Sequence, residues 1–162
     1  MSSQDFKIVV NSSVNGTVLN TTSYMSYSFD FTQFKDGFYE VTFSFCSTGE
    51  NDVDPSNPIE LRVNFNGANG ACYTTNALYK VGTVKTTHLG ILYPQQLSAS
   101  TGFIQASFQD NIPTVIQKPM NFETFTVSLI DPTTNTFWID NLATALTNYL
   151  LVLNFKKIHS NI

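Results

Sequence analysis

Charged side chains are scarce in this sequence of 162 residues. They make up 12% of it, about half the share that a soluble domain usually carries. The only arginine is Arg62, and the net charge is −4. Direct binding to DNA or RNA needs clustered Lys and Arg side chains that neutralise phosphates. Because the sequence contains no such cluster, we expect no direct contact with nucleic acid.

Long apolar runs are also missing. A membrane-spanning helix needs about twenty consecutive apolar residues, and no stretch of the sequence reaches that length. The first ten residues, MSSQDFKIVV, lack the basic and apolar regions of a secretory signal. We therefore expect neither a membrane span nor a secretory signal in this sequence.

Cysteine and histidine are few. Two cysteines, Cys46 and Cys72, do not make a disulfide framework in a chain of this length, so we expect free thiols. The two histidines, His88 and His159, have no second ligand at the spacing of a metal site. The sequence also shows no nucleophile elbow, phosphate-binding loop or zincin helix. We expect no enzyme activity, cofactor or metal.

The acidic residues give no clear site either. Glu40, Glu60 and Glu123 alternate with apolar residues, so they are predicted to project outward rather than to form a buried catalytic pair. The stretch 49–58, GENDVDPSNP, begins like a calcium loop. The positions that would need Gly and Glu hold Pro55 and Leu61, so we predict a solvated acidic loop there.

What the sequence does contain is a strong alternation of apolar and polar residues. Only a strand, with its period of two, places every second side chain on one face. The clearest strands are predicted at 23–31, 38–47, 59–65, 123–130 and 149–155. Weaker ones are predicted at 6–10, 17–20, 88–93, 103–108, 113–117 and 136–139, and turn residues separate them. Only 140–148 could hold a helical turn or two.

The closing stretch NYLLVLNFKKI (148–158) decides between a strand and a helix. Its odd-numbered residues from 149 to 155 are all apolar, and Leu150 and Val152 on the other face are apolar as well. This pattern predicts a strand that is covered on both sides at its start and exposed at its end. The chain is long enough for one domain with a core.

The number and spacing of these strands favour an all-β fold, an antiparallel β-sandwich built as a single eight-stranded jelly roll. We divide the chain into an N-terminal arm or edge strands (1–22), the jelly-roll domain (23–158) and a short C-terminal tail (159–162).

Asn, Ser and Thr replace the missing charges. Such a polar but uncharged surface suits a protein that lies against neighbours, although an ordinary all-β domain has the same composition. Aromatic residues near loops or strand ends could anchor an interface or stack on a ligand, or simply form the rim of the core. These candidates are Tyr73, Tyr79, Tyr93 and Trp138.

The second half of the sequence resembles a known family. The segment MNFETFTVSLIDPTTN and the closing NYLLVLNFKKI are similar to the ending of small single-jelly-roll capsid proteins from large icosahedral double-stranded DNA viruses and their satellite viruses. The residues that carry the resemblance are Phe125, Val127, Leu129 and Asp131 in the first segment and Tyr149, Leu151, Leu153 and Phe155 in the second.

The resemblance implies a structural virion protein, a minor capsid or penton component that joins or supports the capsomers of an icosahedral shell. It further implies other capsid proteins as partners, the major capsid protein above all, and a homo-oligomer, a trimer or a pentamer. The alternative is a carbohydrate-binding or C1q/TNF-like trimeric β-sandwich module, since those proteins have jelly rolls with similar aromatic strands.

Overall fold

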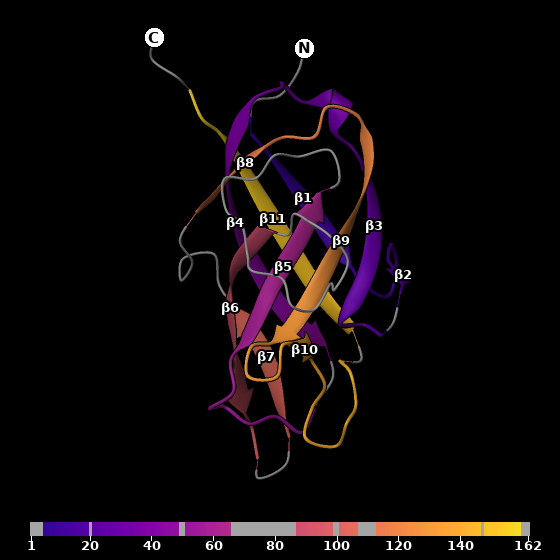
Figure 1. Cartoon of the computed structure of the whole chain (residues 1–162), viewed down its shortest axis with the longest axis vertical. Helices are drawn as coiled ribbons and strands as arrows, with labels where there is room; N and C mark the ends of the chain where they lie inside the picture. Colours follow the sequence, from indigo (N-terminus) through magenta and orange to yellow (C-terminus); the bar gives the residue numbers. More distant parts are fainter. Residues whose placement is uncertain are drawn as a thin grey trace.

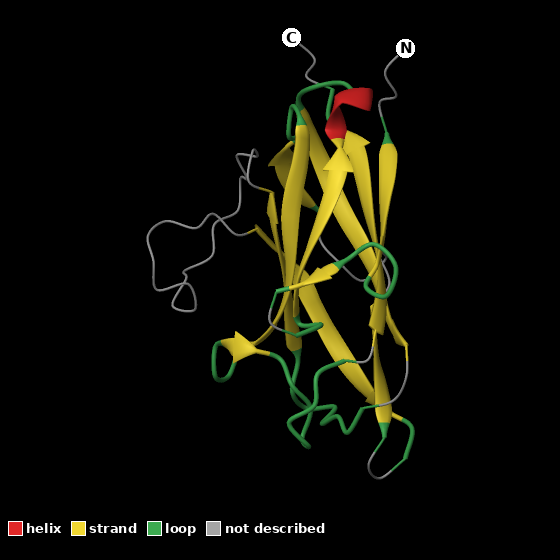
Figure 2. Cartoon of the chain, turned by 90° about the vertical axis from the view of Figure 1, so that its right-hand side faces the viewer, coloured by secondary structure: helices red, strands yellow, loops and turns green. Residues whose placement is uncertain are grey.

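The computed structural model describes residues 5–19, 21–48, 51–65, 87–98, 101–106, 113–146 and 148–159. Apart from one short 3-10 helix, η1 (Phe31–Gln33), these residues form strands, turns and loops (Figures 1 and 2). The predicted all-β fold is therefore confirmed. None of the described residues belongs to a helix with the length and apolar character needed to cross a bilayer.

The strands are β1 (Phe6–Asn11), β2 (Thr17–Val18), β3 (Tyr24–Asp30), β4 (Phe38–Thr48), β5 (Ile59–Phe65), β6 (Thr87–Gln96), β7 (Gly102–Ala106), β8 (Thr114–Gln117), β9 (Phe122–Asp131), β10 (Thr136–Phe137) and β11 (Asn148–Lys157).

The strands pair in one antiparallel sheet with the order β1-β11-β4-β7-β6-β5-β9-β3-β2, while β8 pairs with β4 and β10 pairs with β9. The long strand β6 connects two halves of this sheet, because its first part pairs with β5 and its last four residues pair with β7. We call β1, β11, β4, β7 and β8 the first half-sheet, and β5, β9, β3, β2 and β10 the second. In Figure 1, β5 and β9 pass in front of β1 and β11.

Side chains from the two half-sheets meet in a common core. The hydroxyl groups of Tyr27 (β3) and Tyr149 (β11) are 2.8 Å apart, and the ring centroids of Phe65 (β5) and Phe155 (β11) are 6.1 Å apart. The apolar positions that alternate in the sequence supply this core, as the strand period requires. The inward faces of the long strands are buried except at Phe29, which is partly exposed, and on β4 they consist of Tyr39, Val41, Phe43 and Phe45.

Three features differ from the sequence prediction. The described residues form eleven strands, each at a predicted position, where an eight-stranded jelly roll was expected, and the additional short strands β2, β8 and β10 each pair along a longer neighbour. Residues 140–146 form turns without a helix. There the Asp140 carboxylate accepts hydrogen bonds from the backbone N–H groups of Leu142 and Thr144, which stabilises a turn instead. The 3-10 helix η1 was not predicted.

A buried lysine fixes η1 to the sheet. Lys118 follows β8, and its side chain is fully buried. Its Nζ donates hydrogen bonds to the backbone oxygens of Phe31 (2.8 Å) and Pro119 (2.7 Å) and lies 3.1 Å from Oδ1 of Asp36. A buried ammonium group is tolerated only when it is paired in this way.

Candidate functional site

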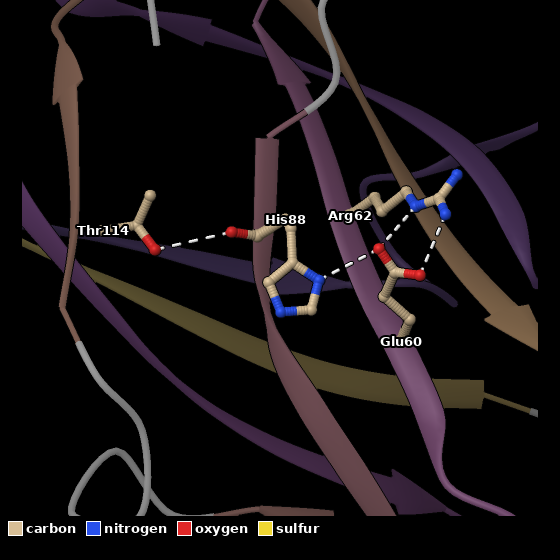
Figure 3. A network of polar contacts seen from close by, with 4 residues as sticks. All are labelled: Glu60, Arg62, His88 and Thr114. Carbon is tan, nitrogen blue, oxygen red and sulfur yellow. Dashed lines mark hydrogen bonds and ion pairs between the residues drawn. The ribbon is translucent and has the colours of Figure 1, made fainter. Parts of the chain in front are cut away.

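A buried ion pair lies on the outward face of β5. Arg62 donates to both carboxylate oxygens of Glu60, from Nε at 2.7 Å and from Nη2 at 2.9 Å. Nδ1 of His88, on the neighbouring β6, lies 2.9 Å from Oε1 of the same carboxylate (Figure 3). The backbone oxygen of His88 accepts a hydrogen bond from the hydroxyl of Thr114 at 3.4 Å. The network therefore connects β5, β6 and β8.

The carboxylate of Glu60 is held in its ionised form. Burial alone would raise the pKa of Glu60, but the hydrogen bonds from His88 and Arg62 and their positive charge outweigh it and lower the pKa to about 2. Both oxygens are occupied by these partners. An ionised, fully bonded carboxylate is a poor proton acceptor near neutral pH, so the network suits a structural role.

Glu60 lies on the outward face of β5, as predicted, but it is buried there, with 8% of its surface exposed. The strand β5 lies inside the sheet and is covered on both faces, and its neighbours on the same outward face, Ser128 and Ile130 of β9, are buried as well. A carboxylate is retained there because Arg62 neutralises it. Glu40 and Glu123 are partly exposed.

Acidic side chains also line a small hollow of about 190 Å³ between the loop 52–58 and the segment 138–141. The Asp140 carboxylate accepts from Asn51 Nδ2 and from the backbone N–H of Asp52, in addition to the two bonds within its own turn. Burial raises the pKa of Asp140, and these hydrogen bonds lower it further than burial raises it. Asp54 accepts from Ser56.

These carboxylates therefore stabilise the loops that carry them. Among the described residues, no three His, Cys, Asp or Glu side chains gather in a way that could hold a metal ion.

The outward face of the first half-sheet differs from both of these places because it is broad and accessible. We call it the outer face, and it extends over β1, β11, β4, β7 and the last residues of β6. One end carries charges around a hollow of about 430 Å³, a volume within the range of ligand pockets. We call this the charged end, and its charged residues are Asp5, Lys7, Glu40 and Lys156.

The rest of the outer face has no charged side chain among the residues described. Cross-strand partners place Val9 beside Val152, Leu150 beside Cys46, and Tyr93 beside Gln105. We call this region the uncharged band. Its outward residues are Val9, Asn11, Ser44, Cys46, Thr48, Tyr93, Gln95, Phe103, Gln105, Asn148, Leu150 and Val152.

Several apolar side chains of the uncharged band are exposed. Val9 is 57% exposed and Tyr93 is 60% exposed. Leu150 is 39% exposed, which corrects the prediction that the start of the last strand is covered on both sides. Its outward face meets solvent, because β11 has neighbouring strands at its sides and the core on only one face. Cys46 is a free, exposed thiol in the middle of the band.

The four aromatic candidates from the sequence have different positions. Tyr93 lies on the uncharged band. Trp138 follows β10 and is a core residue, 5% exposed, so its ring is not available to a surface ligand. Tyr73 and Tyr79 lie outside the described residues. The structure therefore brings one of the four candidates to an accessible surface.

Comparison with known proteins identifies no family for this chain. No family model matches the chain, and neither a curated protein nor a solved structure matches it.

Proposed function

We propose that this protein is a structural virion protein, a minor capsid or penton component that joins or supports the capsomers of an icosahedral shell. The observation that carries the proposal is the uncharged band, an accessible surface on which five neighbouring strands place no charged side chain among those described. Shell subunits must bury such surfaces against one another, and burying uncharged groups costs far less than burying charges.

The strand pairing supports a jelly roll, the fold that viral capsid domains share with lectins and cupins. A jelly roll arises when an eight-stranded hairpin wraps around a core, so that the first strand pairs with the eighth and the second with the seventh. With the short strands β2, β8 and β10 set aside, β1 pairs with β11 and β3 with β9. The inner pairs β4–β7 and β5–β6 follow the same rule.

The resemblance of the last forty residues agrees with this proposal. The residues that carry it, in β9 and β11, are inward-facing and buried at all positions but Asp131, the partly exposed last residue of β9. These residues form adjacent parts of the core in both half-sheets. The resemblance therefore concerns the centre of the fold rather than its surface.

Incorporation into particles tests the proposal. The protein would be expressed with candidate major capsid proteins of large double-stranded DNA viruses and their satellites, and particles would be purified by sedimentation. We expect the protein in the particle fraction at a fixed ratio to the major capsid protein. Its exclusion from well-formed particles in every combination would contradict the proposal.

Tyr93 favours a second candidate function, carbohydrate binding. Its exposed ring beside Gln105 combines an apolar face with hydrogen-bonding groups, as sugar-binding surfaces do. A glycan array tests this function: specific binding that Tyr93→Ala abolishes would support it, and the absence of any binding would exclude it for the glycans tested.

A further inference from the structure

We propose that the outer face is the contact surface between two copies of this chain, related by a two-fold axis that lies in the plane of contact and runs across the strands. The inference does not rest on the virion role, because it follows from the size and charge pattern of the face. Rings of three or five copies would use other, head-to-tail contacts.

The size of the outer face is sufficient for a specific dimer. Its strands are spaced by about 4.8 Å and rise by about 3.4 Å per residue. Because only β11 and β4 run its whole length, whereas β1, β7 and the last part of β6 are shorter, the face measures roughly 600 Å². This area is at the lower end of what each partner buries in a specific complex.

The charge pattern favours a second copy in one orientation. The chain has a net charge of −4, so two copies repel each other overall. The uncharged band removes this repulsion locally. The proposed axis places the charged end of each copy over the far end of the other, where Asn148 and Thr48 offer uncharged hydrogen-bonding groups. No like charges then meet.

Small side chains allow the two faces to approach. Along the centre of the outer face, β4 presents Thr42, Ser44 and Cys46, and β11 presents Asn154 and Val152. None of these side chains is long, whereas longer charged ones surround the hollow at the charged end. Two such faces can pack at the usual distance between sheets, about 10 Å.

A matched pair of substitutions tests the dimer. Val9 is 57% exposed in the uncharged band, and Val18 is 54% exposed in β2 of the second half-sheet. Val9→Glu places a charge on each copy within the contact, whereas Val18→Glu adds the same charge elsewhere. By sedimentation velocity over a series of concentrations, we expect a dimer of the natural protein that Val9→Glu weakens by at least about tenfold and Val18→Glu leaves unchanged.

Cys46 provides an independent readout on the same face. With Cys72→Ser removing the second thiol, the rate at which maleimide modifies Cys46 should fall as the dimer forms, and it should stay constant when Val9→Glu is also present.

A monomer at every concentration would overturn the proposal and leave the face to a different partner. Equal weakening by Val9→Glu and Val18→Glu, or a dimer in which Cys46 reacts at the monomer's rate, would overturn it as well. None of these results bears on incorporation into particles.

Discussion

The hydroxyl groups of Tyr27 and Tyr149 share a hydrogen bond of 2.8 Å in the centre of the core. Tyr27 lies on β3 and Tyr149 on β11, so the bond joins the two half-sheets. The two residues are 4% and 1% exposed. Buried hydroxyl groups are usually hydrogen-bonded, and in this pair each hydroxyl is the hydrogen-bond partner of the other within the core.

Alkaline pH should destabilise the protein through this pair. Burial raises the pKa of Tyr27 from 10.0 to about 12 and also raises the pKa of Tyr149. Between pH 10 and pH 12 the unfolded chain releases these protons while the folded protein keeps them. The free energy of unfolding should thus be unaffected by these groups below pH 10 and fall as the pH rises toward 12. Denaturant titrations from pH 8 upward measure it.

The double substitution Tyr27→Phe and Tyr149→Phe is the control. It removes both ionisable hydroxyl groups and keeps the rings, so it should remove most of the alkaline loss while leaving stability at pH 7 nearly unchanged. An alkaline loss of the same size in the double variant would show that other groups cause it.

Replacing Glu60 should be costly because it leaves Arg62 buried without a counter-charge. We expect Glu60→Gln to lower the free energy of unfolding by about 3 kcal/mol. The double substitution Glu60→Leu with Arg62→Met removes both charges and should recover part of that loss. If the single and double variants lost equal stability in denaturant titrations, the ion pair would not be the cause.

The same carboxylate predicts an acid dependence. The pKa of Glu60 is lowered from 4.5 to about 2, so its ionised form contributes stability that is fully present above pH 4.5 and is lost as the pH falls toward 2. Unfolding measured through this interval should show a shallower decline for Glu60→Gln than for the natural protein. Parallel curves would contradict the assigned shift.

The sequence predicted the inward faces of the long strands well, because alternation is a local property. The faces of β4, β5 and β11 follow from their own residues. The outward faces were less predictable. Glu60 on β5 and Leu150 on β11 both alternate with core residues, yet one is buried and the other exposed. The difference depends on what covers each strand, and no local pattern records it.

Contacts between distant residues were also beyond sequence reasoning. The Asn51–Asp140 hydrogen bond joins residues that are 89 positions apart, and the Glu60–His88 contact joins residues 28 apart. The short strands β2, β8 and β10 were predicted at 17–20, 113–117 and 136–139, but their pairing with the longer strands β3, β4 and β9 was not. The uncharged band also depends on strand pairing, because Cys46 and Tyr93 become neighbours only through Gln105, which pairs with both.

Lys118 should contribute to stability through its buried bonds rather than through its ion pair. Lys118→Met removes the buried ammonium group that donates to the backbone oxygens of Phe31 and Pro119, of which Phe31 keeps only the N–H of Phe34, and we expect a loss of about 2–3 kcal/mol. Asp36 is 62% exposed at its side chain, so Asp36→Asn should change stability by less than about 1 kcal/mol. Comparable losses for the two variants in thermal unfolding would show that the ion pair with Asp36 matters as much as the buried hydrogen bonds.

Trp138 and Tyr93, both candidates from the sequence for an interface, a stacked ligand or the rim of the core, should behave in opposite ways. Trp138 is 5% exposed within the core, so Trp138→Ala should cost about 3–5 kcal/mol. Tyr93 is 60% exposed, so Tyr93→Ala should change the stability of the monomer by less than about 0.5 kcal/mol.

Since Trp138 is the only tryptophan, its fluorescence also reports burial directly. The folded protein should resist quenching by acrylamide, and the unfolded chain should not. Efficient quenching in the folded state would place the ring at the surface and restore Trp138 as a candidate for ligand stacking.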